Sequence, residues 1–252
     1  MDIKISDIKN ELAELKEDRI GDFIRKYSQD PRSSVQGLVK KAEKSLDKYN
    51  VELSRIESMR EYENRYAECG YICGIDEVGR GPLAGPVVAG AVILPKDCRI
   101  LYVNDSKKLS EKRREELYDI IMEKAVSVGL GFVDNKRIDE INILQATYEA
   151  MREAIGKLTV RPDILLNDAV TIPGVTIKQV PIVKGDAKSI SIAAASIVAK
   201  VTRDRLMKEL SDKYPGYDLA ANKGYGSAAH IEAIKKLGPT EIHRMSFIGN
   251  FI

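Results

Sequence analysis

The spacing of apolar residues changes once along this chain, near residue 70. Residues 34–66 form a long polar helical pattern, and no glycine occurs between Gly37 and Gly70. A shorter helix is expected before this pattern, with Ser6 as its N-terminal cap. The apolar face of that helix would hold Ile8, Leu12 and Leu15. Residues 1–67 are therefore predicted to form an all-helical N-terminal extension.

From Tyr71 onward, short apolar runs alternate with helical patterns. The apolar runs predict five strands, at residues 71–76, 87–94, 128–134, 162–168 and 177–183. The helical patterns predict helices at residues 110–127, capped by Ser110, at 141–158 and at 189–210. The link between the first two strands is too short for a helical crossover, so these strands should be antiparallel. Residues 68–252 are thus expected to form an α/β domain, a mixed sheet with helices on its faces and a helical C-terminal region.

The composition is that of a globular protein, because 44% of the 252 residues are hydrophobic and 31% are charged. Three cysteines are too few for a disulfide framework and favour a reducing compartment. The N-terminus shows no apolar signal region, and the longest apolar stretch, Pro86–Pro95, is too short to span a bilayer. We expect a cytoplasmic protein, monomeric and without a membrane partner. The net charge of +2 neither supports nor excludes a nucleic-acid partner.

Acidic residues follow the apolar interiors of three predicted strands. Asp76 and Glu77 follow the first, Asp168 the fourth and Asp186 the fifth. Strand ends are where open α/β sheets assemble their sites, and four carboxylates meeting there would repel one another unless cations held them together. Oxygen ligands alone favour Mg²⁺ or Mn²⁺. Two such ions, about 3.5–4 Å apart, are the usual apparatus for in-line phosphoryl displacement.

Each of these acids also has a purely structural interpretation. Asp186 alone would suit the cap of the following helix, and Asp168 alone is an ordinary turn residue. Asp76 and Glu77 could simply end a strand. The joint pattern favours a site, because all of them fall at strand ends.

The glycine run Gly79–Gly85 superficially resembles a dinucleotide-binding loop. That loop requires a helix after it, whereas Pro86 and an apolar strand follow here, so the interpretation fails. A glycine turn beside two carboxylates instead suits the close approach of a sugar-phosphate. A tight hairpin turn is compatible with both.

Basic and aromatic residues add to the candidate site. Six basic residues lie between Lys184 and Lys208, against two acidic ones, although a solvated helix face explains residues 203–208 equally well. Tyr225 stands between two glycines, where it would either stack on a sugar or base or serve as a packing anchor. No serine-hydrolase elbow accompanies the two histidines, and Cys73, in an apolar strand, is expected in the core.

With these residues assembled, the chain resembles the type 2 ribonucleases H, specifically the bacterial ribonuclease HII family. The matching segments occur in family order and extend from about Tyr71 to the C-terminus. They are Gly74–Val87, Asn104–Ser110, Ile141–Ala146, Lys184–Asp186, Ser191–Ile197, Ala199–Arg205 and Asn222–Gly226. The first segment is highly specific to the family. Asn167 departs from it, because an apolar residue usually precedes the third carboxylate.

The resemblance implies a ribonuclease H-like fold and an endoribonuclease that cleaves the RNA strand of RNA–DNA hybrids. It also implies incision on the 5′ side of a single ribonucleotide embedded in duplex DNA. The implied catalytic and metal-binding residues are Asp76, Glu77, Asp168 and Asp186. The implied substrate-binding residues are Gly79, Arg80 and Gly81 at the ribose 2′-hydroxyl, Tyr225 at the next sugar, and Lys107 and Lys184 at phosphates.

The expected mechanism is two-metal-ion hydrolysis that leaves a 5′-phosphate and a 3′-hydroxyl, with Mg²⁺ or Mn²⁺ as cofactor. Two alternatives stay open. One is a metal-dependent DNA nuclease of the same fold, which would ignore the 2′-hydroxyl. The other is a non-catalytic hybrid-binding module, which four carboxylates disfavour, because negative charge weakens phosphate binding unless metals are present.

Overall fold

The computed structural model describes residues 3–250, which divide into two compact units between Ser58 and Met59. The first unit contains α1 (Ile5–Glu14), α2 (Ile20–Tyr27) and α3 (Ser33–Ser58). It is all-helical, as predicted. None of the helices within residues 3–250 combines the length and the apolar character needed to cross a membrane.

The first unit has its own apolar core, built from the three helices. Ile8, Phe23 and Val39 are among its buried side chains, and Leu12 and Leu15 pack against them. The expected cap was wrong: α1 begins at Ile5, so Ser6 lies inside the helix, and Ser6 Oγ donates a hydrogen bond to Asp7.

The long helical pattern of residues 34–66 is interrupted. Helix α3 ends at Ser58, and a separate short helix, α4 (Glu61–Arg65), follows in the second unit. The boundary between an extension and a catalytic domain after residue 67 stays a prediction.

The second unit is built on a mixed five-stranded sheet in the order β3-β2-β1-β4-β5. The strands are β1 (Ile72–Val78), β2 (Val87–Ile93), β3 (Ser127–Val133), β4 (Ile164–Asp168) and β5 (Lys178–Ile182). Strands β1 and β2 are antiparallel, as predicted from their short link, and so are β2 and β3. Strands β4 and β5 run parallel to β1. The α/β prediction is confirmed.

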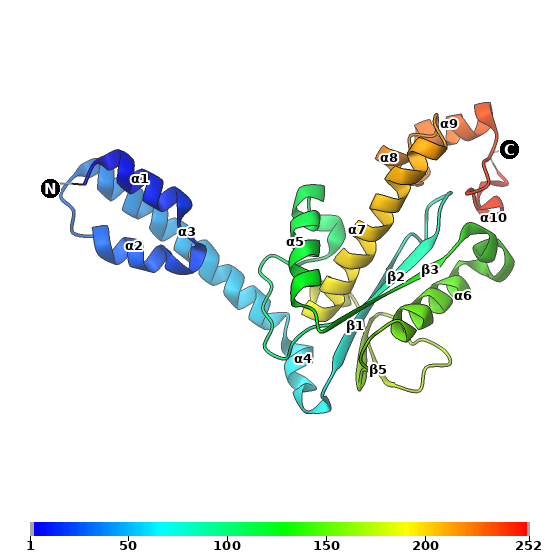
Figure 1. Ribbon diagram of the computed structural model, residues 1–252, viewed down its shortest axis with the longest axis horizontal. Helices are drawn as coiled ribbons and strands as arrows, with labels where there is room; N and C mark the ends of the chain where they lie inside the picture. Colours follow the sequence, from blue (N-terminus) through cyan, green and yellow to red (C-terminus); the bar gives the residue numbers. More distant parts are fainter. Residues whose placement is uncertain (1–2, 251–252) are drawn as a thin grey trace. The chain divides into compact units, whose positions relative to one another are not determined.

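Two long helices cover opposite faces of the sheet (Figure 1). Helix α7 (Ile190–Lys213) packs so closely that a Cβ at Gly90 would lie 2.6 Å from a carbonyl oxygen of the helix. Helix α6 (Asn135–Gly156) approaches the other face in the same way, since a Cβ at Gly131 would lie 1.9 Å from one of its carbonyls. Glycine is required at both positions because a side chain would separate helix from sheet.

The helix boundaries follow local capping. Ser110 caps α5 (Glu111–Lys124), as expected, through a side-chain oxygen that accepts a backbone N–H bond. Ser189 caps α7 in the same way, and Asp186 does not. Helix α6 begins earlier than predicted and contains one non-helical residue, Asn142, at φ 66°. The Asn142 side chain accepts hydrogen bonds from the next turn, so the helix restarts there.

The C-terminal region adds three short helices, α8 (Leu219–Asn222), α9 (Ala228–Leu237) and α10 (Met245–Ile248). They enclose a second apolar cluster, together with Leu83 and Met207. Leu83 and Ala84, in the glycine turn between β1 and β2, belong to this cluster, so the turn packs against the C-terminal helices.

Candidate active site

The sheet register brings two acids to the same edge. Parallel strands β1 and β4 pair Ile75 with Asn167, so the next residues, Asp76 and Asp168, are neighbours. Asp186 lies in a 3₁₀ turn, Gly185–Ala187, shortly after β5. One carboxylate oxygen of each of the three acids lies within 4.8 Å of the other two. Three of the four expected carboxylates thus converge, as the strand-end pattern predicted.

The unusual Asn167 leaves this register intact. Its side chain is fully buried, and Nδ2 donates hydrogen bonds to Gln179 Oε1 at 2.8 Å and to the Val170 carbonyl at 3.1 Å. Strand β4 pairs regularly on both sides through this position. The substitution therefore adds a buried polar contact without displacing Asp168.

Asp76 is buried among other acids. Burial raises the pKa of Asp76 well above its usual range, and the negative charges of Glu77 and Asp168 raise that pKa further. A hydrogen bond with Ser196 on α7 acts in the opposite direction. Ser196 Oγ in turn lies 2.9 Å from Ser106 Oγ. These hydroxyls fix the orientation of the Asp76 carboxylate.

The neighbouring acids are crowded in the same way. Burial raises the pKa of Glu77, and the Arg80 guanidinium, 3.4 Å from Glu77 Oε1, opposes that rise. Burial also raises the pKa of Asp186, with further contributions from the negative charges of Asp105 and Asp168. Asp168 Oδ1 accepts a hydrogen bond from the Gly185 N–H at 2.7 Å.

This donor set fits a hard divalent cation. It offers carboxylate oxygens close together, and their mutual repulsion would be relieved by positive charge placed among them. Asp76, Asp168 and Asp186 would be the first ligands, and Glu77, whose pKa is raised by the Asp168 charge, stands beside them. Neither histidine nor cysteine belongs to this cluster, which favours Mg²⁺ or Mn²⁺ over zinc.

A cavity of about 650 Å³ opens beside these acids. It brings together most of the residues predicted to bind substrate, from three distant parts of the sequence. Its lining includes Asp76, Glu77, Gly79, Arg80, Gly81, Lys107 and Tyr225. Lys184 lies elsewhere, exposed and in a left-handed conformation (φ 58°), directly before the turn that carries Asp186.

Tyr225 faces this cavity with 39% of its surface exposed. A Cβ placed on Gly81 would lie 3.9 Å from Tyr225 Cε1, which is van der Waals contact, so the aromatic ring lies next to the glycine turn in the cavity lining. The exposed fraction favours a contact surface over the packing-anchor interpretation.

Much of the predicted basic surface is paired. Arg205 forms an ion pair with Glu115, Lys208 with Glu111 and Lys200 with Asp204. The solvated-face interpretation was wrong for Arg203, which is fully buried. Lys107 lies close to the acids, and its positive charge partly opposes the rise in the pKa values of Glu77 and Asp186.

Sequence reasoning assigned no individual role to several residues of the site, although it counted Lys200 among the basic residues near it. Asp105 contacts Asp186, Ser106 and Ser196 connect to Asp76, and Lys200 lines the cavity. Asp105 and Ser106 lie in the segment Asn104–Ser110, and Ser196 lies in Ser191–Ile197. Short polar residues beside apolar ones in these two segments were the sequence feature that could have indicated a role in the site.

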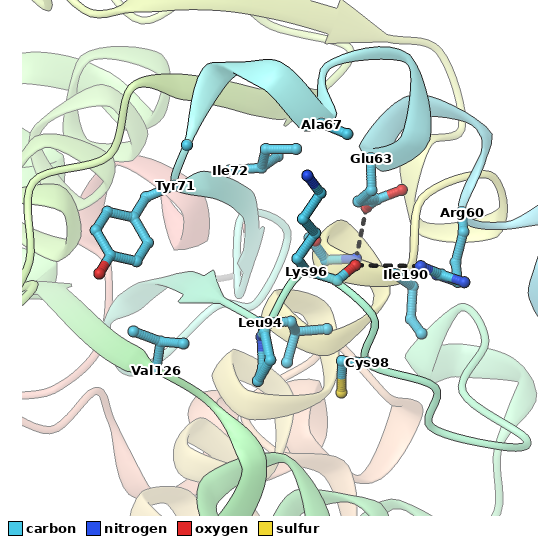
Figure 2. Close-up of a pocket in the computed structure, with 13 residues that line it drawn as sticks. Arg60, Glu63, Ala67, Tyr71, Ile72, Leu94, Lys96, Cys98, Val126 and Ile190 are labelled. Carbon is cyan, nitrogen blue, oxygen red and sulfur yellow. Dashed lines mark hydrogen bonds between the residues drawn. The ribbon is translucent and has the colours of Figure 1, made fainter.

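A second cavity, of about 110 Å³, lies near the opposite end of β1 (Figure 2). Its lining includes Ile72, where β1 begins, and Ile190, where α7 begins. Glu63 Oε1 accepts hydrogen bonds from Ser189 Oγ at 2.5 Å and from the Ser191 N–H at 3.0 Å. This acid therefore caps helix α7.

The histidines and the strand cysteine have structural positions. His230 and His243 are buried, with their Nε2 atoms 3.2 Å apart. Cys73 is a free thiol in the core, as predicted.

Comparison with known proteins gives one answer over nearly the whole chain. The family described as Ribonuclease HII matches residues 73–250, and the Ribonuclease HII N-terminal domain matches residues 4–67. A ribonuclease HII of Lachnoclostridium phytofermentans is 65% identical over 99% of this chain and 98% of its own. One of Clostridioides difficile is 52% identical over 100% of this chain and 99% of its own. The crystal structure of ribonuclease H2 from Pyrococcus horikoshii aligns with a TM-score of 0.59 and 28% identity, over 72% of this chain and 98% of that one.

Proposed function

This chain belongs to the ribonuclease HII family and is a metal-dependent type 2 ribonuclease H acting on RNA–DNA hybrids, and we propose that it also incises duplex DNA on the 5′ side of a single embedded ribonucleotide. One observation carries this finer proposal. Asp76, one of the three converging carboxylates, lines a cavity together with Glu77, a glycine turn and an exposed tyrosine, and this arrangement suits recognition of one sugar next to the reacting phosphate.

The acids are proposed to hold the cofactor. Asp76, Asp168 and Asp186 would bind divalent ions directly, and Glu77 would complete the set. Bound Mg²⁺ or Mn²⁺ would supply activation of water and stabilisation of negative charge on the phosphodiester. The products would carry a 5′-phosphate and a 3′-hydroxyl.

The remaining residues position the substrate. The backbone of Gly79, Arg80 and Gly81 would contact the 2′-hydroxyl, since two of these residues have no side chain to block the approach. Tyr225 would pack against the neighbouring sugar. Lys107, which lines the same cavity, would contact a phosphate, whereas Lys184 would do so only at the margin of the site.

The test is incubation of the full chain with Mg²⁺ or Mn²⁺ and a labelled duplex that carries one ribonucleotide, beside an all-DNA duplex of the same sequence. We expect one nick, directly 5′ of the ribonucleotide, and none when a chelator is present. Cutting of both duplexes would indicate a general DNA nuclease, and an intact ribonucleotide duplex would refute the proposal.

A further inference from the structure

Two arginines lie fully buried behind the glycine turn. Arg244 donates hydrogen bonds to the carbonyl oxygens of Gly79 at 2.6 Å, Arg80 at 2.9 Å and Gly85 at 2.8 Å. Arg203, on helix α7, donates to those of Pro86 at 2.9 Å and Ala84 at 3.1 Å. All of these acceptors are main-chain carbonyls of one short segment, which we name the glycine loop (residues 79–86).

These bonds fix which way the peptide groups of the glycine loop face. In a trans peptide the N–H points away from the C=O of the preceding residue. Because the carbonyls of Gly79 and Arg80 point to the buried Arg244, the N–H groups of Arg80 and Gly81 are turned away from it. The same residues line the open cavity, so donor groups are available on the side where a sugar would bind.

Arg203 also joins the glycine loop to the segment that carries Tyr225. It donates to the Lys223 carbonyl at 2.9 Å, and its guanidinium carbon lies 5.9 Å from the centre of the Tyr225 ring. Its side chain fills the space over Gly79 (φ 90°), where a Cβ would lie 2.3 Å from Arg203 Nε. One buried side chain thus contacts both parts of the expected sugar site.

The chemistry of the guanidinium suits this task. Its five N–H donors lie in one rigid plane, so it can bridge several carbonyls at fixed spacing, whereas a lysine ammonium is a single point of charge. Burial and the positive charge of Arg203 lower the pKa of Arg244 to about 9, so Arg244 is still protonated at neutral pH. Carbonyl oxygens supply the partial negative charge that each buried cation needs.

We propose that Arg203 and Arg244 are positioning residues for ribonucleotide selection, because they hold the glycine loop and the Tyr225 ring in one fixed arrangement. This inference rests on the proposed incision at single ribonucleotides. Neither arginine needs to touch the substrate, since each acts through main-chain groups that do.

The experiment compares Arg244→Lys and Arg203→Lys with a matched control, Arg205→Lys, on the same helix as Arg203 but exposed and paired with Glu115. A small displacement of positioned groups can cost on the order of a hundredfold in rate. For each of the two test variants we expect such a loss in kcat on the single-ribonucleotide duplex, with a much smaller change in KM. Cutting of the all-DNA duplex should stay absent in all three variants, as expected for the wild type, and Arg205→Lys should keep the wild-type kcat on the single-ribonucleotide duplex.

Two further measurements separate positioning from general damage. Backbone amide exchange of residues 79–86 should become faster in both test variants, while Mn²⁺ binding to the carboxylates stays unchanged. If Arg244→Lys fails to fold, Arg203→Lys decides alone. A comparable loss in Arg205→Lys, weakened Mn²⁺ binding, or an unchanged rate in the two test variants would overturn the inference. An intact ribonucleotide duplex with the wild-type chain would instead refute the proposed function, and the inference with it.

Discussion

The second unit buries an acidic side chain near each end of strand β1, and the two acids have opposite electrostatic surroundings. Asp76 lies among other acids, whose charges raise its pKa. Glu63 is the one acid among the residues that line the small cavity, which also include Arg60 and Lys96 (Figure 2). It accepts two hydrogen bonds at the start of helix α7. Burial of a carboxylate is therefore common to a site and to a structural cap, whereas crowding of like charges is specific to the site.

The largest expected effect comes from removing one crowded charge. Asp76→Asn should lower turnover by about a thousandfold or more, because a proposed metal ligand is lost. Without divalent ions, its melting temperature should stay the same or rise, since one source of repulsion disappears. Adding Mn²⁺ at a hundred times its Kd should stabilise the wild type by about 2.7 kcal/mol and the variant by much less.

Asp119→Asn is the matched control, because Asp119 is an exposed acid on helix α5. It should leave both the turnover and the Mn²⁺-dependent gain in melting temperature unchanged. Wild-type turnover in Asp76→Asn would remove Asp76 from the site.

The crowded acids were predictable because their signal is local. Asp76 and Asp168 each follow an apolar strand, and a parallel neighbour relation brings such ends together. The cap Ser110 was predictable for the same reason, as it directly precedes a helical pattern. Whether the acids bind metal stays a prediction.

The supporting residues were not predictable from neighbours in sequence. Arg244 bonds carbonyls about 160 residues away, so nothing next to it in the chain indicates its partners. Arg203 sits in a charged stretch that is typical of a solvated face, and only tertiary packing shows it buried. Ser6 failed as a cap because the helix begins before its expected start, at Ile5.

The next largest expected effect is a loss of stability on removing Glu63, near the other end of β1. Glu63→Ala should lower the free energy of unfolding by about 2–3 kcal/mol, because the Ser191 N–H and the Ser189 hydroxyl lose their acceptor in a buried place. The kcat should change less than twofold, since the carboxylate cluster is untouched. Urea denaturation measures the free energy of unfolding, and steady-state assays measure kcat.

Its control is Glu61→Ala, on the same short helix. Glu61 is exposed and pairs with Arg65, so this change should cost no more than about 0.5 kcal/mol. A large loss of turnover in Glu63→Ala at unchanged stability would make Glu63 a functional acid and end the contrast with Asp76.

The smallest expected effect is a pH dependence of stability. It comes from a third buried set of titratable side chains, His230 and His243. The Thr240 N–H donates to His243 Nδ1, and the Tyr225 carbonyl can only accept from His230 Nδ1. Only neutral rings with the shared proton on His243 Nε2 satisfy every bond.

Burial, together with the charge of His230, lowers the pKa of His243 to about 4, below its ordinary value of 6.5. Between these values the unfolded chain binds more protons than the folded one, so stability is fully present above pH 6.5 and declines as the pH falls toward 4. We expect a loss of about 1–2 kcal/mol between pH 7 and pH 5, measured by urea denaturation. His243→Gln should weaken this dependence. An identical pH dependence in that variant would show that the histidine pair is not its source. The carboxylate cluster cannot cause this loss of stability, because acids with raised pKa values stabilise the fold as the pH falls.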